Sequence, residues 1–257
     1  MKFLIYVSMI VVLLNAKTIT KEQCSSMDDM IFIQNECINY FVEDAEAEGK
    51  LNIIVHGAWK DGTNTLARYT PFASTLSMNT DITTIAFAMP GYSKSSTNNL
   101  QGLLHDKKVT RFGKAEYIDF LHKVFVAFKS KYKVKEINVI AHSAGAALSA
   151  TVSAKYPMLI KNIFLAGGRY DLTNHKGQKG LISVNDYLNN IGTYTNYFII
   201  YGTKDTTSKP KVSIDFYDKL KALNKNVKLL KVEDHAHLDL DMSDESVELI
   251  STTLEEE

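Results

Sequence analysis

The sequence predicts an α/β fold with a mostly parallel central sheet, helices on both faces and an antiparallel hairpin at the N-terminal edge. Short, nearly continuous apolar runs alternate with amphipathic helical segments, as expected of such folds. Runs of this kind suit strands that are buried on both faces. Each run ends in small, polar or ionisable residues, and ligands of open α/β sheets bind beyond the carboxyl ends of the strands.

The strands are predicted from these apolar runs. Residues 30–33 and 37–42 form the expected hairpin, because Gln34, Asn35 and Glu36 between them have turn character. The remaining predicted strands cover residues 51–55, 82–88, 137–141, 162–166, 197–202 and 227–232.

Helices are predicted between and after the strands. Residues 117–132 place apolar side chains three and four positions apart, which is typical of an amphipathic helix. Residues 144–155 are rich in alanine, and residues 213–223 also have helical character. Ser243 can cap a final helix, with Asp244 in its electropositive first turn.

A serine stands where a predicted strand meets a predicted helix, in the sequence Ala-His-Ser-Ala-Gly at 141–145. A sharp strand-to-helix turn exposes a serine hydroxyl and needs small residues two positions away on either side, which here are Ala141 and Gly145. The usual motif has glycine where Ala141 stands, so this is a variant. The alternative interpretation of Ser143 is a helix cap.

Four motifs at strand ends resemble, in order, those of the α/β-hydrolase superfamily. They are His-Gly-Ala-Trp at 56–59, Met-Pro-Gly-Tyr-Ser at 89–93, Ser143, and Gly-Thr-Lys-Asp at 202–205 followed by Pro210. The resemblance runs from about residue 51 to the C-terminus. It implies the α/β-hydrolase fold and a serine hydrolase.

The same resemblance implies an acid and a histidine after the serine, in the order nucleophile, acid, histidine. Asp205 lies in the matching turn, and Asp171 is the rival acid because some members of the superfamily carry the acid after the preceding strand. His237 fits the expected position of the histidine, directly after the small residue Ala236, and His235 remains the alternative.

The resemblance also implies the roles. Ser143 would attack a carbonyl carbon, His237 would take its proton, and Asp205 would orient the imidazole and stabilise its charged form. The backbone N–H groups of Ala58 and Ala144 would bind the oxyanion.

Three neighbouring side chains have less definite roles. We expect His56 to brace the oxyanion turn by hydrogen bonding, although it is a second candidate base. His142 is expected to be structural, because a side chain next to the nucleophile points elsewhere in such a turn. Trp59 is a candidate for binding the acyl group of the substrate, or it packs in the core.

The catalytic half of the chain resembles dienelactone hydrolases, feruloyl-type esterases and prolyl-oligopeptidase-like catalytic domains. This predicts hydrolysis of a carboxylic ester or related acyl bond in a small molecule, with no cofactor and no metal. A peptidase or amidase of the same fold, or a secreted binding module without catalysis, are the alternatives. Roughly thirty residues separate the strands at 162–166 and 197–202, which is room for one short helix and loops, so we expect no large cap domain.

Charge excludes other classes of partner. The chain of 257 residues has 29 Lys and Arg and 29 Asp and Glu, so its formal net charge is zero. No basic surface for nucleic acid or an anionic membrane is therefore expected.

The N-terminus has the pattern of a secretory signal, with Lys2, an apolar run at 3–14 and then Ala16. We expect a signal peptide at 1–16, one domain at 17–257, and a secreted or periplasmic protein that is not inserted in a membrane after cleavage. An uncleaved N-terminal anchor is the alternative.

Cys24 and Cys37 are the only cysteines and lie close together, directly after the predicted signal. In an oxidising compartment they are expected to form one structural disulfide. Two free buried thiols are the alternative.

Overall fold

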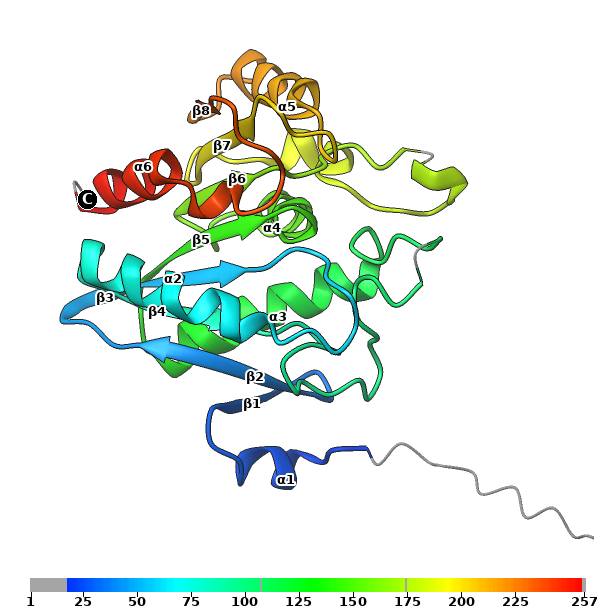
Figure 1. The fold of residues 1–257 in the computed structure, drawn as a ribbon, viewed down its shortest axis with the longest axis vertical. Coiled ribbons are helices and arrows are strands. Elements are labelled where there is room, and N and C mark those ends of the chain that lie inside the picture. Colours follow the sequence, from blue (N-terminus) through cyan, green and yellow to red (C-terminus); the bar gives the residue numbers. More distant parts are fainter. Residues whose placement is uncertain (1–17, 107, 174, 256–257) are drawn as a thin grey trace, which may run out of the picture.

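The computed structural model describes residues 18–106, 108–173 and 175–255, and the predicted signal peptide at 1–16 lies outside the described residues. Its centre is one sheet of eight strands in the order β1-β2-β4-β3-β5-β6-β7-β8 (Figure 1). The strands are β1 (Met30–Ile33), β2 (Glu36–Glu43), β3 (Ala47–Val55), β4 (Ile82–Phe87), β5 (Glu136–His142), β6 (Asn162–Ala166), β7 (Asn196–Gly202) and β8 (Val227–Val232).

The strand directions confirm the predicted fold class. β2 runs antiparallel to both β1 and β4, whereas all other neighbouring strands are parallel. The hairpin turn consists of Gln34 and Asn35, both with left-handed backbone (φ of 48° and 65°). Glu36 already pairs with Ile33 and begins β2, so its assignment to the turn was wrong. Two left-handed residues in a two-residue turn match the twist of the strands they join.

The helices cover both faces of the sheet. They are α1 (Lys21–Ser25), α2 (Thr65–Thr80), α3 (Ala115–Lys131), α4 (Ala144–Lys155), α5 (Pro210–Ala222) and α6 (Asp244–Glu255). One hydrophobic cluster joins α3, α4 and α5 to one face of the sheet, and a second joins α2 and α6 to the other face. Burial on both faces explains the nearly continuous apolar character of the central strands.

The helix α2 was not expected from the sequence. Pro71 lies inside this helix, and a proline in a helix interior removes a backbone donor, so the segment does not have the composition of a helix. Tertiary contacts outweigh this effect, because Tyr69, Phe72 and Leu76 are buried in the second cluster. The side chain of Asn64 caps the helix by accepting a hydrogen bond from the N–H of Ala67 (3.2 Å).

An asparagine ladder crosses the parallel part of the sheet. Each amide donates to the carbonyl oxygen of the asparagine on the preceding strand in the sheet, from Asn138 to Asn52 (3.0 Å) and from Asn162 to Asn138 (3.0 Å). The same contact links Asn196 to Asn162 (2.8 Å) and Asn226, which directly precedes β8, to Asn196 (3.2 Å). Because a buried amide is costly without partners, this ladder favours a single register of these strands.

A disulfide joins α1 to the start of β2, between Cys24 and Cys37, and both residues are fully buried. The free-thiol alternative is therefore wrong. The disulfide fixes the N-terminal segment against the antiparallel edge of the sheet.

The described residues between β6 and β7 form no large cap. They form two short 3-10 helices, η1 (His175–Gly177) and η2 (Val184–Asn190), and a third, η3 (Leu240–Met242), follows β8. The prediction of no large cap is thus confirmed. Among the described helices, none is both long and apolar enough to cross a membrane.

Candidate active site

Ser143 occupies the turn between β5 and α4, in a backbone conformation with φ of 55° and ψ of −116°. A non-glycine residue in this region is strained, and such strain persists only where the surrounding structure enforces it. A side chain on Gly145 would collide with the backbone carbonyl groups of Val55 and His56, so glycine is required there. The methyl group of Ala141 is fully buried, which shows that the fold accommodates alanine at this position.

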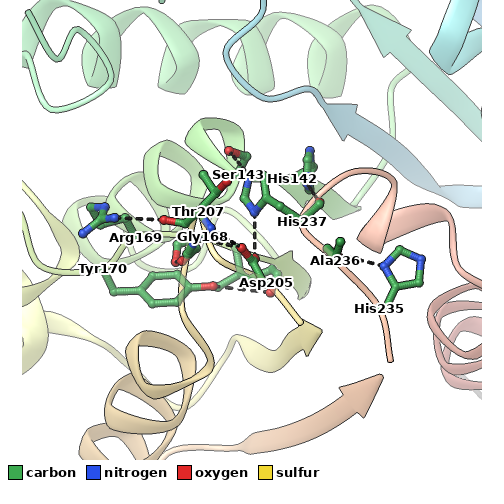
Figure 2. A network of polar contacts seen from close by, with 12 residues as sticks. His142, Ser143, Gly168, Arg169, Tyr170, Asp205, Thr207, His235, Ala236 and His237 are labelled. Carbon is green, nitrogen blue, oxygen red and sulfur yellow. Dashed lines mark hydrogen bonds and ion pairs between the residues drawn. The ribbon is translucent and has the colours of Figure 1, made fainter. Parts of the chain in front are cut away.

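Ser143, His237 and Asp205 form one continuous chain of hydrogen bonds (Figure 2). The Nε2 atom of His237 lies 2.8 Å from the hydroxyl oxygen of Ser143. Its Nδ1 atom lies 2.7 Å from Oδ2 of Asp205. A carboxylate can only accept, so Nδ1 carries the proton and Nε2 is left to accept from the serine.

The carboxylate of Asp205 is held rigidly. The side chain is fully buried, and its Oδ1 accepts hydrogen bonds from the backbone N–H groups of Thr207 and Ser208, both 2.8 Å away. The hydroxyl of Ser208 in turn donates to the carbonyl of Gly168 in the loop after β6 (2.7 Å). The turn after β7 is therefore tied to its neighbouring loop, and only Oδ2 faces His237.

The alternative acid and histidine lie elsewhere. The imidazole of His235 turns away from Ser143, and its Nδ1 contacts the carbonyl of Ala236 (2.9 Å) (Figure 2). Asp171 is exposed, and its carboxylate accepts a hydrogen bond from the N–H of Thr173 (2.9 Å). Neither residue has a hydrogen bond to His237 or Ser143 among the described residues.

His56 braces the loop at 56–59, which we call the oxyanion turn. Its Nε2 accepts a hydrogen bond from the N–H of Met89 (3.0 Å), so its Nδ1 is protonated and donates to the carbonyl of Gly57 (2.6 Å). Burial lowers the pKa of His56 to about 4, because the charged form has no access to water. The ring is therefore neutral at neutral pH and both of its nitrogen atoms are occupied.

The oxyanion turn approaches the serine closely. A Cβ atom on Gly57 would lie 2.9 Å from the Cβ of Ser143, so only glycine permits this approach. Ala58, which follows, and Ala144, at the start of α4, therefore flank the serine. Neither N–H group donates a hydrogen bond to another described residue.

Two side chains near the serine have structural contacts. His142 is buried, and its Nε2 donates to the backbone carbonyl of His237 (2.8 Å), so it contacts the loop rather than the serine hydroxyl. Trp59 is partly buried against the first hydrophobic cluster, and the guanidinium of Arg68 lies over its ring, 5.1 Å from the centroid. This contact was not expected from the sequence.

Other supporting residues were also missed. The amides of Thr207 and Ser208 that bind Asp205 follow an aspartate by two and three positions, which is a local turn pattern that the sequence contains. Asp239 and Asp241 lie after His237 without any motif to single them out. Within the described residues, no group of three or more His, Cys, Asp or Glu side chains is arranged to hold a metal ion.

Comparison with known proteins agrees with this architecture. A family profile described as alpha/beta hydrolase fold matches residues 53–180, which include the oxyanion turn and Ser143. No curated protein gives a significant match.

Several solved structures are similar. Esterase Pf2001 of Pyrococcus furiosus is 22% identical over 92% of this chain and 95% of that chain, with a TM-score of 0.68. Est1E of Butyrivibrio proteoclasticus, solved with ferulic acid bound, is 16% identical over 88% of this chain and 96% of that chain, with a TM-score of 0.62. A predicted CIB-like hydrolase of Thermoplasma acidophilum is 13% identical over 89% and 97%, with a TM-score of 0.64.

These structures share the fold of this chain at low sequence identity. Together with the family profile and the eight-stranded sheet, they define its class, and the chain belongs to the α/β-hydrolase superfamily.

Proposed function

We propose that this protein is a serine hydrolase that cleaves a carboxylic ester or a related acyl bond in a small molecule. The observation that carries the proposal is the unbroken chain of contacts from Asp205 through His237 to the hydroxyl of Ser143. An imidazole in this position can remove the serine proton during attack on a carbonyl carbon.

The mechanism follows from the atoms in contact. The Ser143 hydroxyl oxygen forms a bond to the acyl carbon while its proton moves to Nε2 of His237. The buried Asp205 stabilises the imidazolium that results. Return of this proton to the leaving alcohol completes the acyl-enzyme, and a water molecule, activated by the same imidazole, then releases the acid and regenerates Ser143.

The oxyanion of each tetrahedral intermediate needs donors that are already in place. The N–H groups of Ala58 and Ala144 have no other described acceptor and flank the serine. One such donor contributes about 3 kcal/mol to stabilisation of the transition state. Because these donors belong to the backbone, substitutions of either alanine would not remove them.

The substrate is a small ester that reaches Ser143 directly from solvent. Ser143 is partly exposed, and the described residues between β6 and β7 form no large cap above it. Two similar structures are described as esterases, and another, Est1E, is described with ferulic acid bound. Trp59, next to Ala58, is the side chain that we assign to the wall of the acyl site.

A labelling and turnover experiment tests the proposal. A fluorophosphonate probe should label the folded wild-type protein, and the protein should hydrolyse p-nitrophenyl esters from a panel graded by acyl length. Ser143→Ala and His237→Ala should abolish turnover. The matched control His235→Gln should leave it within about twofold, since the His235 ring hydrogen-bonds to the carbonyl of Ala236 and, among the described residues, not to Ser143 or Asp205. A folded wild type that neither reacts with the probe nor cleaves any ester would refute the proposal. Amide analogues in the same panel distinguish an esterase from an amidase.

We also propose that the mature protein acts in an oxidising compartment after removal of residues 1–16. The buried Cys24–Cys37 disulfide supports this location, because such bonds persist mainly outside the cytosol. Mass spectrometry of the protein recovered from the medium or periplasm should give an N-terminus at Lys17. Retention of the first sixteen residues would favour the uncleaved anchor.

A further inference from the structure

Two loops that meet at Ser143 come from distant strands. The oxyanion turn follows β3, and residues 233–239, which we call the histidine loop, follow β8. β5, β6 and β7 lie between these two strands in the sheet. Backbone pairing therefore does not hold the two loops directly to each other, although each of them approaches the serine within contact distance.

One side chain contacts both loops. The guanidinium of Arg68, in α2, lies over the ring of Trp59, which directly follows Ala58. The same guanidinium donates to the carboxylate of Asp239, two residues after His237. A planar guanidinium can stack on an aromatic ring and bind a carboxylate with its edge at the same time, in a fixed geometry that the ammonium group of lysine lacks.

The helix that carries Arg68 is itself fixed. Its first turn is held by the hydroxyl of Ser93, which accepts a hydrogen bond from the N–H of Leu66 (2.8 Å). Ser93 belongs to the loop after β4, at the end of the Met-Pro-Gly-Tyr-Ser motif. The hydroxyl of its neighbour Tyr92 donates to the backbone carbonyl of Trp59 (2.7 Å). The loop after β4 therefore contacts both Trp59 and the first turn of the helix that carries Arg68.

We propose that Arg68 is a positioning residue that holds the oxyanion turn and the histidine loop at the spacing that the reaction requires. The inference rests on the proposed function of Ser143 and His237. Both the oxyanion donor at Ala58 and the base at His237 must meet the same tetrahedral centre. Small displacements of reacting groups have large effects on rate, with about a hundredfold loss for a misplacement of roughly 1 Å.

The pair is too exposed to contribute much to folding. The side chains of Arg68 and Asp239 are 35% and 39% exposed, and ion pairs of this exposure add little to stability. A positioning role therefore predicts a loss of kcat in a protein whose thermal stability is nearly unchanged.

The experiment measures kcat, KM, the rate of fluorophosphonate labelling and the midpoint of thermal unfolding. It compares wild type, Arg68→Met, Arg68→Lys, Asp239→Asn and the double variant Arg68→Met/Asp239→Asn. The matched control is Lys211→Met, which removes an exposed ion pair with Asp215 within α5.

We expect Arg68→Met to lower kcat and the labelling rate about tenfold with KM within about twofold, because the reacting groups move while the methionine side chain can still pack against Trp59. Arg68→Lys should recover part of this loss, Asp239→Asn should resemble Arg68→Met, and the double variant should be no slower than either single variant because the residues act together. Lys211→Met should match the wild type.

Three results would overturn the inference. The first is a kcat of Arg68→Met equal to that of the wild type. The second is a double variant whose fold-loss in kcat is the product of the fold-losses of the two single variants. The third is a loss of activity that matches the fraction of unfolded protein. A wild type that neither reacts with the probe nor cleaves esters refutes the proposed function and this inference together. A reactive wild type with an unaffected Arg68→Met variant refutes this inference alone.

Discussion

Replacing Asp205 by asparagine should reverse the tautomer of His237. The Oδ1 atom of Asp205 accepts two backbone N–H groups, those of Thr207 and Ser208. In Asp205→Asn the amide oxygen must keep this position, because the amide nitrogen cannot accept a hydrogen bond. The NH₂ group then occupies the position of Oδ2 and faces Nδ1 of His237, which lies 2.7 Å from Oδ2 in the wild type.

The consequence for catalysis is large. Nδ1 of His237 must lose its proton to accept from the amide, so Nε2 carries the proton and can no longer accept the proton of Ser143. A wrong tautomer in a triad of this kind lowers turnover by about 10⁴, or about 5 kcal/mol of transition-state stabilisation. The exchange of oxygen for nitrogen keeps shape and volume, so the loss should occur in a folded protein.

Steady-state kinetics with p-nitrophenyl acetate measure the effect, with Ser143→Ala as the background and circular dichroism as the check on folding. Nitrogen NMR of the His237 ring should show the proton on Nδ1 in the wild type and on Nε2 in Asp205→Asn. Asp171→Asn is the matched control and should keep kcat/KM within about twofold, since this exposed carboxylate has no hydrogen bond to His237 or Ser143 among the described residues. An Asp205→Asn variant with more than a tenth of wild-type activity would refute the reasoning.

Three further predictions concern stability. The pKa of His56 in the folded protein, about 4, lies below its ordinary value of 6.5, so the stability that this residue contributes at neutral pH is lost as the pH falls from 6.5 to 4. In denaturant titrations, the free energy of unfolding of the wild type should therefore fall by about 3 kcal/mol more than that of His56→Gln between pH 7 and pH 4. Burial raises the pKa of Asp241, so the buried carboxylate destabilises the folded protein once the pH rises above 3.8, where the unfolded chain ionises. Asp241→Asn should therefore have a higher free energy of unfolding than the wild type at pH 7 and should lose this advantage near pH 4. An advantage that is independent of pH would contradict this prediction. Asn138→Leu should cost about 3 kcal/mol because it removes two buried side-chain hydrogen bonds. Asn226→Leu, at the exposed end of the ladder, should cost less than about 1 kcal/mol; equal costs would rule out the ladder as the cause.

The parts of the fold that the sequence predicts are those governed by local pattern. The apolar strands and the turns at their ends are visible because burial on both faces imposes a continuous apolar run. The disulfide was predicted because Cys24 and Cys37 directly follow an expected secretory signal, and it is present. Ser143, Asp205 and His237 could be named as candidates because the superfamily places each of them directly after a strand, and the structure brings these three side chains together.

The features that were missed depend on contacts between distant segments. Asn52 reads as a polar exception in an apolar strand, and its role emerges only when the sheet aligns it with Asn138. α2 is obscured by Pro71, and its stability comes from packing against the sheet. The contact of Arg68 with Asp239 spans 171 positions of sequence and follows no local pattern.

The assignment of Ser143 as nucleophile can be tested by trapping the intermediate itself. The protein is mixed with p-nitrophenyl acetate, quenched in acid during turnover and mapped by peptide mass spectrometry. We predict one acetyl group on the peptide that contains Ser143 in the wild type, where the Nε2 atom of His237 lies 2.8 Å from the serine hydroxyl. His237→Ala lacks this base and should show little or no acetylation. Turnover in which the acetyl group is found on another residue, or in which Ser143 remains unmodified while His237→Ala retains full activity, would contradict the account.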